Sequence, residues 1–188
     1  MLKFKGYGIG QILYLSLSFL CTKLNFPSSR LIRLPFFFRV SGRLTLAPGF
    51  TSGRSLRVDV HSNGYLSFGE NVQINDNCQI ACAGRLRIGK NVLIASKVFI
   101  TDHDHNFRES GSPVEWGLNV TDVIIGDDCW LGNGVQVLKG VTIGRGSIVG
   151  AGSVVTKSFP EFSIIAGVPS KLISSRSTEI SGFEHNIK

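Results

Sequence analysis

Aliphatic residues recur every six positions in the second half of this chain. The residue after each is mostly glycine, and the fourth residue after each of the first five is small or β-branched. A strict period of six fits neither an ordinary strand, with a period of two, nor a helix, with a period near 3.6. The aliphatic series is Ile125, Leu131, Val137, Ile143, Val149 and Val155.

The same period appears earlier, with a short break before Ile88. Leu46 and Val58 suit a weaker opening turn, and the chain's 22 glycines suit many tight corners. Six residues make one short strand and one turn, so three such units close a triangular coil of about eighteen residues that stacks on its neighbours. The pattern predicts an all-β parallel β-helix. The earlier series is Phe68, Ile74, Ile80, Ile88, Ile94 and Ile100.

Interruptions of the repeat divide the chain into three parts. We expect an N-terminal helical and basic segment at 1–43, the β-helix domain at 44–173, and a polar tail at 174–188. An extended loop at 101–124, which contains Pro113, interrupts the coils. Loops this long inside a regular solenoid are uncommon unless they carry function.

The N-terminal segment allows two interpretations. Gly6 to Thr22 carries no charge, lies between lysines, and is shorter than the roughly 20 apolar residues that a spanning helix needs. It predicts either a helix lying in a membrane interface or a helix packed on the chain's own domain. Basic residues follow it, at Lys23, Arg30, Arg33 and Arg39.

The net charge and the cysteines limit which ligands and which cell compartment the sequence favours. The net charge is +7, but there is no compact Lys/Arg run, so we expect no nucleic acid and favour the phosphates of a cofactor or a lipid. The cysteines form no CxxC pair, so they predict no metal site and suit buried apolar positions in a reducing cytoplasm. They are Cys21, Cys78, Cys82 and Cys129.

The repeat, together with the ending Ala166-Gly167-Val168-Pro169-Ser170-Lys171, resembles the hexapeptide-repeat acyltransferases. That resemblance implies a left-handed parallel β-helix, a homotrimer, and acetyl-CoA as co-substrate without a metal. Further segments resemble the O-antigen O-acetyltransferases of lipopolysaccharide biosynthesis. This resemblance implies a sugar acceptor, which is either lipid-linked or free, and a cytoplasmic location. If the N-terminal helix binds lipid, the protein would lie at the inner face of the membrane. These segments include Arg33-Leu34-Pro35, Gly49 to Gly53, Gly69 to Asp76 and Ile94 to Ile100.

Acetyl transfer to a hydroxyl needs a base, and a histidine suits that role because its pKa lies near neutrality. Direct attack requires no serine or cysteine nucleophile. The resemblance makes His105 the first candidate base and His103 its competitor. Asp102 or Asp104 would orient the imidazole, as a carboxylate does in catalytic triads.

The resemblance also assigns binding residues. Asn77 and Trp130 would contact the acceptor sugar. The alternative for Asn77 is a polar surface position without function, and the alternative for Trp130 is a packing role; each is nearly as well supported. The glycine-rich corners around Ala151 would leave the backbone open to a pantetheine arm, and the lysines would meet phosphates. The coenzyme A contacts that the resemblance implies are Asn133, Ala151, Thr156, Lys157 and Lys171.

Two other functions share this type of fold. A γ-type carbonic anhydrase would need three zinc-binding histidines, but His61, His103, His105 and His185 do not have that spacing. A non-catalytic β-helix scaffold would need neither the Asp-His-x-His segment nor the Lys171 ending.

Overall fold

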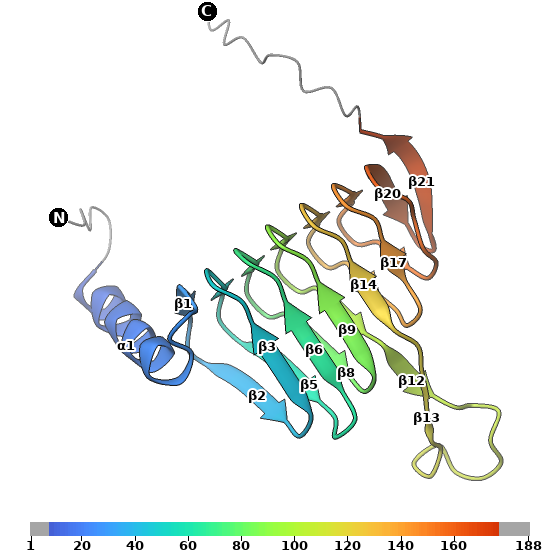
Figure 1. The fold of residues 1–188 in the computed structure, drawn as a ribbon, viewed down its shortest axis with the longest axis horizontal. Helices are drawn as coiled ribbons and strands as arrows, with labels where there is room; N and C mark the ends of the chain where they lie inside the picture. Colours follow the sequence, from blue (N-terminus) through green and yellow to red (C-terminus); the bar gives the residue numbers. More distant parts are fainter. Residues whose placement is uncertain (1–7, 177–188) are drawn as a thin grey trace, which may run out of the picture.

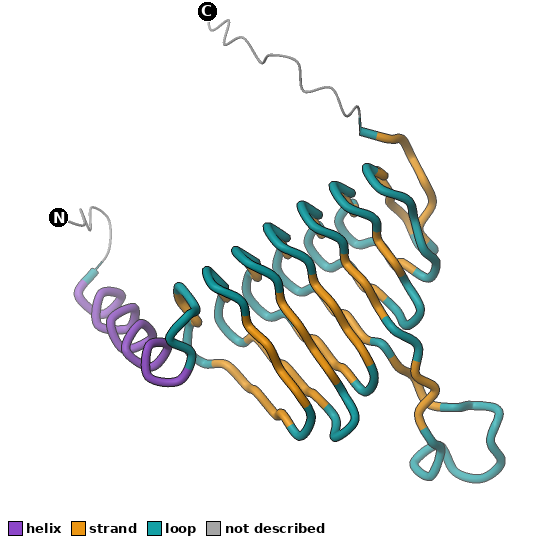
Figure 2. The backbone as a smooth tube through the Cα atoms, viewed as in Figure 1, coloured by secondary structure: helices purple, strands orange, loops and turns teal. Residues whose placement is uncertain are grey.

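The computed structural model describes residues 8–176. The chain forms a β-solenoid of about seven turns, preceded by one helix, α1 (Ile9–Asn25). Figure 1 shows the coils stacked along one axis from β1 to β21, and Figure 2 shows short strands alternating with turns in every coil. The all-β parallel β-helix predicted from the six-residue period is confirmed, and so is the left-handed form that the family resemblance implies.

Three parallel sheets form the walls of the solenoid. Sheet A contains β1 (Leu31–Ile32), β4 (Thr51–Ser52), β7 (Gln73–Ile74), β10 (Leu93–Ile94), β15 (Trp130–Leu131), β18 (Ile148–Val149), β20 (Ser163–Gly167) and β21 (Ser170–Ser175). Sheet B contains β2 (Phe36–Val40), β5 (Leu56–Val60), β8 (Gln79–Cys82), β11 (Phe99–Thr101), β16 (Gln136–Val137) and β19 (Val154–Val155). Sheet C contains β3 (Arg43–Leu46), β6 (Tyr65–Phe68), β9 (Arg85–Ile88), β14 (Val123–Ile125) and β17 (Thr142–Ile143). Only β20 and β21 pair antiparallel within these walls.

Residues of the six-residue series form buried columns inside the solenoid. In sheet B, Ile80, Ile100 and Val137 lie in register on successive coils, and each is at most 1% exposed. Burying one such side chain contributes roughly 1.5–3 kcal/mol, so each coil depends on its neighbours for stability.

The turns between sheets also stack. We call the turns from sheet A to sheet B the A–B corner, and the turns from sheet B to sheet C the B–C corner. Backbones approach closely at these corners and strand ends: a Cβ added to Gly126 would lie 2.6 Å from the backbone nitrogen of Arg145. This close approach explains why glycine so often follows the buried aliphatic residue.

The expected loop at 101–124 contains a β-hairpin arm. Its strands are β12 (His103–His105) and β13 (Leu118–Val120), which pair antiparallel and project from the B–C corner (Figure 1). The Thr121 N–H donates a hydrogen bond to the Asp102 carbonyl at 2.8 Å, which closes the base of the arm. The arm therefore starts at the polar cluster singled out in the sequence.

Sheet pairing begins before residue 44, the expected start of the β-helix domain. Strand β1 pairs with β4, and β2 pairs with β5 over five residues, because Phe36 to Val40 alternates as a strand. Helix α1 precedes this first coil and packs on it. Of the expected tail, 174–188, only Ser174 to Arg176 lie within the described residues, and the first two belong to β21.

Helix α1 packs on the solenoid through polar side chains. Thr22 Oγ1 accepts a hydrogen bond from the Ile32 N–H at 2.8 Å, and Ser18 Oγ accepts one from the Leu34 N–H at 3.3 Å. Ser18 and Thr22 are fully buried, whereas apolar residues on the opposite side of the helix are exposed. Among the described residues, no helix is both long and apolar enough to cross a membrane.

Candidate functional site

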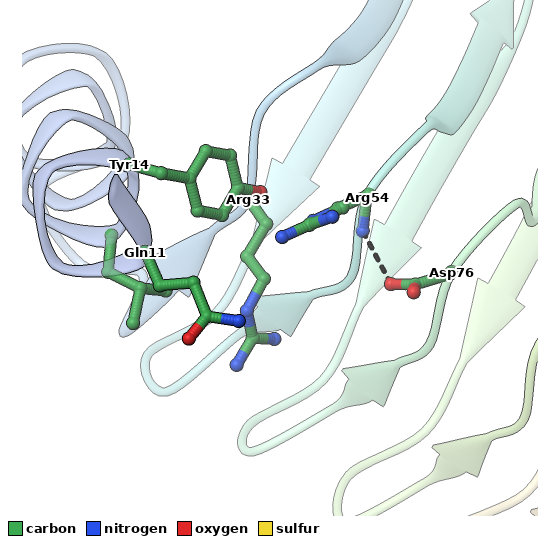
Figure 3. A pocket seen from close by; sticks show the side chains of 6 residues that line it. Gln11, Tyr14, Arg33, Arg54 and Asp76 are labelled. Carbon is green, nitrogen blue, oxygen red and sulfur yellow. Dashed lines mark hydrogen bonds between the residues drawn. The ribbon is translucent and has the colours of Figure 1, made fainter. Parts of the chain in front are cut away.

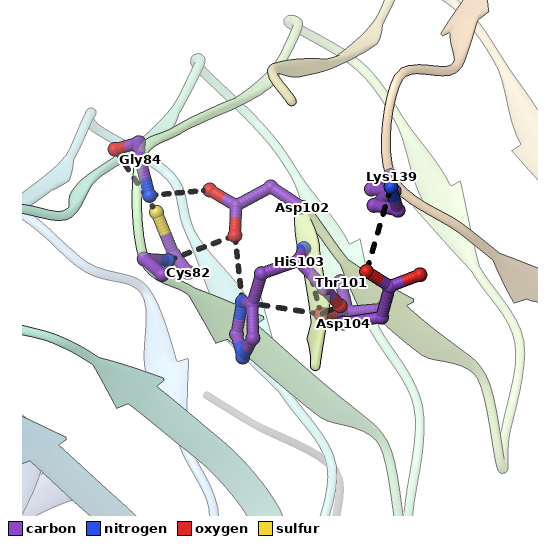
Figure 4. Close-up of polar contacts among 8 residues, drawn as sticks. Cys82, Gly84, Thr101, Asp102, His103, Asp104 and Lys139 are labelled. Carbon is purple, nitrogen blue, oxygen red and sulfur yellow. Dashed lines mark hydrogen bonds and ion pairs between the residues drawn. The ribbon is translucent and has the colours of Figure 1, made fainter. Parts of the chain in front are cut away.

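A buried carboxylate holds His103 at the start of the arm. Asp102 is fully buried at the B–C corner, and its Oδ1 lies 2.8 Å from His103 Nδ1. The same carboxylate accepts hydrogen bonds from the Ala83 and Gly84 N–H groups, each at 2.8 Å (Figure 4). A carboxylate placed this way favours the tautomer with the proton on Nδ1, which leaves Nε2 free to accept a proton.

His105 has no such support within residues 8–176. It lies exposed on β12, and no hydrogen bond to its ring is found among the described residues. Asp104 is directed elsewhere, to an ion pair with Lys139 at 3.4 Å (Figure 4). Of the two expected orienting carboxylates, the structure brings Asp102 to an imidazole, and that imidazole belongs to His103.

His61 is the second histidine of the site, and the sequence analysis did not place it there. Its ring centroid lies 5.1 Å from that of His103, with an edge-on angle of 68°. Both residues occupy the B–C corner, two coils apart, with the short turn at Ala83 and Gly84 between them. Counting positions after β5 and after β11 would have found this relationship, since both histidines closely follow a sheet B strand.

A polar pocket of about 340 Å³ is lined in part by His61, the neighbour of His103. Its polar lining consists of basic, acidic and hydroxyl-bearing side chains from the first two coils, which can donate and accept hydrogen bonds. Such a lining suits a ligand rich in hydroxyl groups. The lining residues are Arg39, Ser41, Asp59, Val60, His61 and Ser62.

Asp59 organises the cationic side of this pocket. Its carboxylate pairs with Arg39 Nε at 2.9 Å and with Arg57 Nε at 2.7 Å. Burial by itself would raise the pKa of Asp59, but the hydrogen bonds and charges of the two arginines outweigh burial and lower the pKa below 3.8. The carboxylate therefore keeps its charge near neutral pH and holds both guanidinium groups along sheet B.

The expected binding residues lie in two separate columns. Asn77, Asn133 and Ala151 all lie at the A–B corner, with Asn133 and Ala151 on successive turns and Asn77 two turns before Asn133. Lys171 joins that end of the solenoid through its pairing with Ala166. Thr156 and Lys157 lie instead at the B–C corner, where the Lys157 ammonium sits 5.7 Å from the centre of the Phe159 ring.

Trp130 points outward from sheet A and is 49% exposed. A single chain therefore does not bring Asn77 or Trp130 beside His103, because sheet B separates the A–B corner from the B–C corner.

The A–B corner has room for an extended ligand. A Cβ added to Gly152 would meet no atom within 4 Å, and Asn133, Ala151 and Lys171 are all exposed. The Gly152 N–H donates to the Asn133 carbonyl at 2.8 Å, so these two turns form one continuous exposed backbone surface. A flexible chain that carries phosphates can lie along such a surface and meet the Lys171 ammonium.

Residues 8–176 contain no candidate metal site. No group of three His, Cys, Asp or Glu side chains in this range is arranged to hold a metal ion. The pair of His61 and His103 lacks a third ligand among these described residues.

Three cysteines are buried in the solenoid. Burial raises the pKa of the Cys82 thiol to about 12 and that of Cys129 to about 11, and it also raises the pKa of Cys78. A buried thiol with a raised pKa is a poor nucleophile, because the thiolate is the reactive form. These cysteines therefore act as small apolar residues of the corners.

Known proteins share the repeat and most of the length of this chain. The family model "Bacterial transferase hexapeptide (six repeats)" matches residues 122–157. The chain is 40% identical over 177 residues, 90% of each chain, to an Escherichia coli (strain K12) protein named as a candidate lipopolysaccharide biosynthesis O-acetyl transferase, WbbJ.

Solved structures show the same fold. A maltose O-acetyltransferase from Clostridium difficile 630 superimposes with a TM-score of 0.61 and 30% identity, covering 75% of this chain and 71% of that one. A galactoside acetyltransferase in complex with coenzyme A superimposes with a TM-score of 0.56 and 29% identity, covering 74% and 64%.

Proposed function

Because this chain belongs to the hexapeptide-repeat acetyltransferases and resembles those of lipopolysaccharide O-acetylation, we propose that it moves the acetyl group of acetyl-CoA onto a sugar hydroxyl. The acceptor is a surface polysaccharide, an O-antigen or capsule, or its precursor. Relatives named for lipopolysaccharide and colanic acid biosynthesis support this acceptor class. The observation that carries the proposal is the imidazole of His103, which is held by buried Asp102 and lies 5.1 Å, between ring centres, from His61 of the polar pocket.

In this proposal His103 is the general base. Asp102 accepts a hydrogen bond from Nδ1–H of His103, so the lone pair of Nε2 is available to the acceptor hydroxyl. The hydroxyl oxygen attacks the thioester carbonyl as Nε2 takes its proton, and the carbon–sulfur bond then breaks. The imidazolium returns the proton to the departing thiolate, which leaves as the thiol of coenzyme A.

The pocket beside His61 is the proposed acceptor site. Sugar hydroxyls both donate and accept hydrogen bonds, and the pocket offers a guanidinium at Arg39, a hydroxyl at Ser62 and an imidazole at His61. The Asp59 pairs hold Arg39 in place, so its charge need not be ordered on binding.

The donor would lie along the A–B corner, with its phosphates at Lys171. Because sheet B separates this corner from His103 within one chain, the proposed homotrimer would complete the site with a neighbouring copy. Asn77 and Trp130 of one copy would then lie near His103 of the next. The assembly is testable by light scattering, since a monomer fully active in solution would remove this part of the proposal.

Helix α1 is the proposed membrane contact, which would keep a cytoplasmic enzyme at the inner face of the membrane. Its exposed apolar residues repeat at intervals of three and four, so they form one stripe along the side that faces away from the coils. An amphipathic helix of this kind lies in the interface without spanning the bilayer. The stripe consists of Ile9, Leu13, Leu17, Leu20 and Leu24.

Acceptor-dependent release of thiol from acetyl-CoA tests the proposed activity. We expect release with glycans of the O-antigen or capsule type, and mass spectrometry should show one added acetyl ester. No release with any glycan, together with no binding of coenzyme A, would overturn the proposal in favour of a scaffold function.

A further inference from the structure

A second polar pocket lies between helix α1 and the A–B corner of the first coils. It has a volume of about 300 Å³, and polar side chains from the helix and from three consecutive coils line it. Figure 3 shows the side chains of Arg33 and Arg54 extending into the space beneath the helix. The pocket is lined by Gln11, Tyr14, Leu15, Arg33, Arg54 and Asp76.

The two arginines carry charge that no carboxylate neutralises. Within residues 8–176, neither Arg33 nor Arg54 forms an ion pair with an acidic side chain. Asp76 is the one acidic residue of the lining, and its Oδ1 accepts a hydrogen bond from the backbone N–H of Arg54 at 2.7 Å. The pocket therefore presents two guanidinium groups and one carboxylate.

The arginine side chains are oriented in advance. The Arg54 guanidinium lies 4.5 Å from the centre of the Tyr14 ring, and the Tyr14 hydroxyl donates to the Leu34 carbonyl at 2.6 Å. Arg33 Nη1 contacts the Ser52 carbonyl at 3.4 Å. Guanidinium groups match the geometry of phosphate oxygens, and prior orientation reduces the entropy lost on binding.

The position of this pocket indicates what kind of phosphate reaches it. The helix that forms one wall also carries the apolar stripe of Ile9, Leu13, Leu17, Leu20 and Leu24 on its opposite face, so the thickness of one helix separates a ligand bound there from a proposed lipid surface. On its other side the pocket adjoins the expected acceptor residue Asn77, whose N–H donates to the Arg54 carbonyl at 2.8 Å.

We propose that this pocket binds the phosphate or diphosphate of a lipid-linked acceptor, with the lipid chain in the bilayer and the sugar directed from the A–B corner toward the His61 pocket of a neighbouring copy in the proposed homotrimer. The inference rests on the proposed function, because it specifies the acceptor of that same reaction. Two charge-assisted contacts are made by Arg33 and Arg54, while Gln11 can donate through its amide.

Vesicle binding tests the site without reference to catalysis. The full chain would be mixed with phosphatidylcholine vesicles that contain a dialkyl diphosphate, and with phosphatidylserine vesicles of equal surface charge. We expect tighter binding to the diphosphate vesicles, and the double substitution Arg33→Gln/Arg54→Gln should weaken that binding by about tenfold or more. Equal binding of wild type to both vesicle types would overturn the proposal, as would unchanged binding of the double variant.

Matched controls distinguish a general loss of positive charge from loss of this pocket. They also distinguish binding of a lipid-linked phosphate from binding of a free phosphate. Arg87→Gln removes an exposed cation from sheet C, away from the pocket, and should leave the preference for diphosphate unchanged. Leu13→Ser/Leu17→Ser should abolish vesicle binding but leave the fold intact, since both side chains are exposed. Displacement of the vesicles by inorganic phosphate or a soluble sugar phosphate at the same phosphate concentration would overturn the lipid-linked acceptor.

Acetyl transfer distinguishes failure of this inference from failure of the proposed function. Arg33→Gln/Arg54→Gln should reduce transfer to a lipid diphosphate-linked sugar by about tenfold or more, yet leave transfer to the same sugar without phosphate unchanged. Equal effects on both acceptors would overturn the phosphate site while the acetyltransferase stands. Absence of transfer to either acceptor by wild type would overturn the proposed function, and the vesicle result would still decide whether the pocket binds phosphate.

Discussion

Asp102 Oδ1 lies 2.8 Å from His103 Nδ1, and the same carboxylate is anchored by the Ala83 and Gly84 N–H groups of the preceding coil. The imidazole is thus held by a residue fixed in the solenoid. Orientation by such a group, and not exposure on the arm, makes His103 the base in our account.

Substituting Asp102 should lower both activity and stability. In Asp102→Asn the side chain keeps only one oxygen acceptor for Ala83, Gly84 and His103, so one buried donor is left without a partner. We expect a loss of about 1–3 kcal/mol in the free energy of unfolding. We also expect a fall of about 10²-fold or more in kcat with little change in KM, since Asp102 is a positioning residue. Chemical denaturation and steady-state kinetics on the same samples would check both effects; a normal kcat would contradict the assignment.

Asp104 provides the matched comparison. Its ion pair with Lys139 is partly exposed, and such pairs contribute about 0–1 kcal/mol. Asp104→Asn should therefore change the unfolding free energy by less than about 1 kcal/mol and leave kcat within a few-fold of wild type. A loss of activity as large as that of Asp102→Asn would show that Asp104 orients the catalytic imidazole.

Asp59 should make the folded chain sensitive to acid. Its folded-state pKa is depressed below 3.8, so the ionised carboxylate stabilises the fold at pH values above that point. This contribution is lost as the pH falls through the lower folded value. We expect Asp59→Asn to cost about 1–2 kcal/mol at neutral pH and to reduce the acid-side decline in stability. Denaturation at a series of acidic pH values would test this, and an unchanged pH dependence in the variant would refute it.

Thiol labelling should reveal the burial of the cysteines. With raised thiol pKa values of about 12 and 11, Cys82 and Cys129 have almost no thiolate at neutral pH. Partly exposed Cys21 should react first with a thiol reagent in the native protein. Mass spectrometry after timed labelling would identify the sites, with denatured protein as the control in which all four react. Rapid native labelling of Cys82 would mean that its coil opens readily.

The core could be predicted from the sequence because most coils repeat one local pattern, in which an aliphatic residue points inward every six positions. Ile125, Leu131 and Val137 are six apart and point inward, and the structure buries all three completely. The six-residue period predicts only which residues point inward and where each turn lies. The first coil was not predicted from this period because burial along Phe36 to Val40 alternates with a period near two, as in a longer strand.

The site was harder to predict because its geometry depends on contacts between coils. The Asp-His-x-His segment was evident, but the choice between His103 and His105 depends on which imidazole the Asp102 carboxylate reaches. That carboxylate is held by Ala83 and Gly84, which lie almost twenty residues earlier in the sequence. The ranking of His105 first came from resemblance alone, whereas our proposal of His103 rests on its contact with Asp102.

The most direct test compares kcat/KM for acetyl transfer in His103→Gln and His105→Gln, with folding verified for both variants. We expect His103→Gln to lower kcat/KM by about 10²–10⁴-fold and His105→Gln to remain within a few-fold of wild type. The reverse result, with activity retained in His103→Gln and lost in His105→Gln, would contradict this expectation.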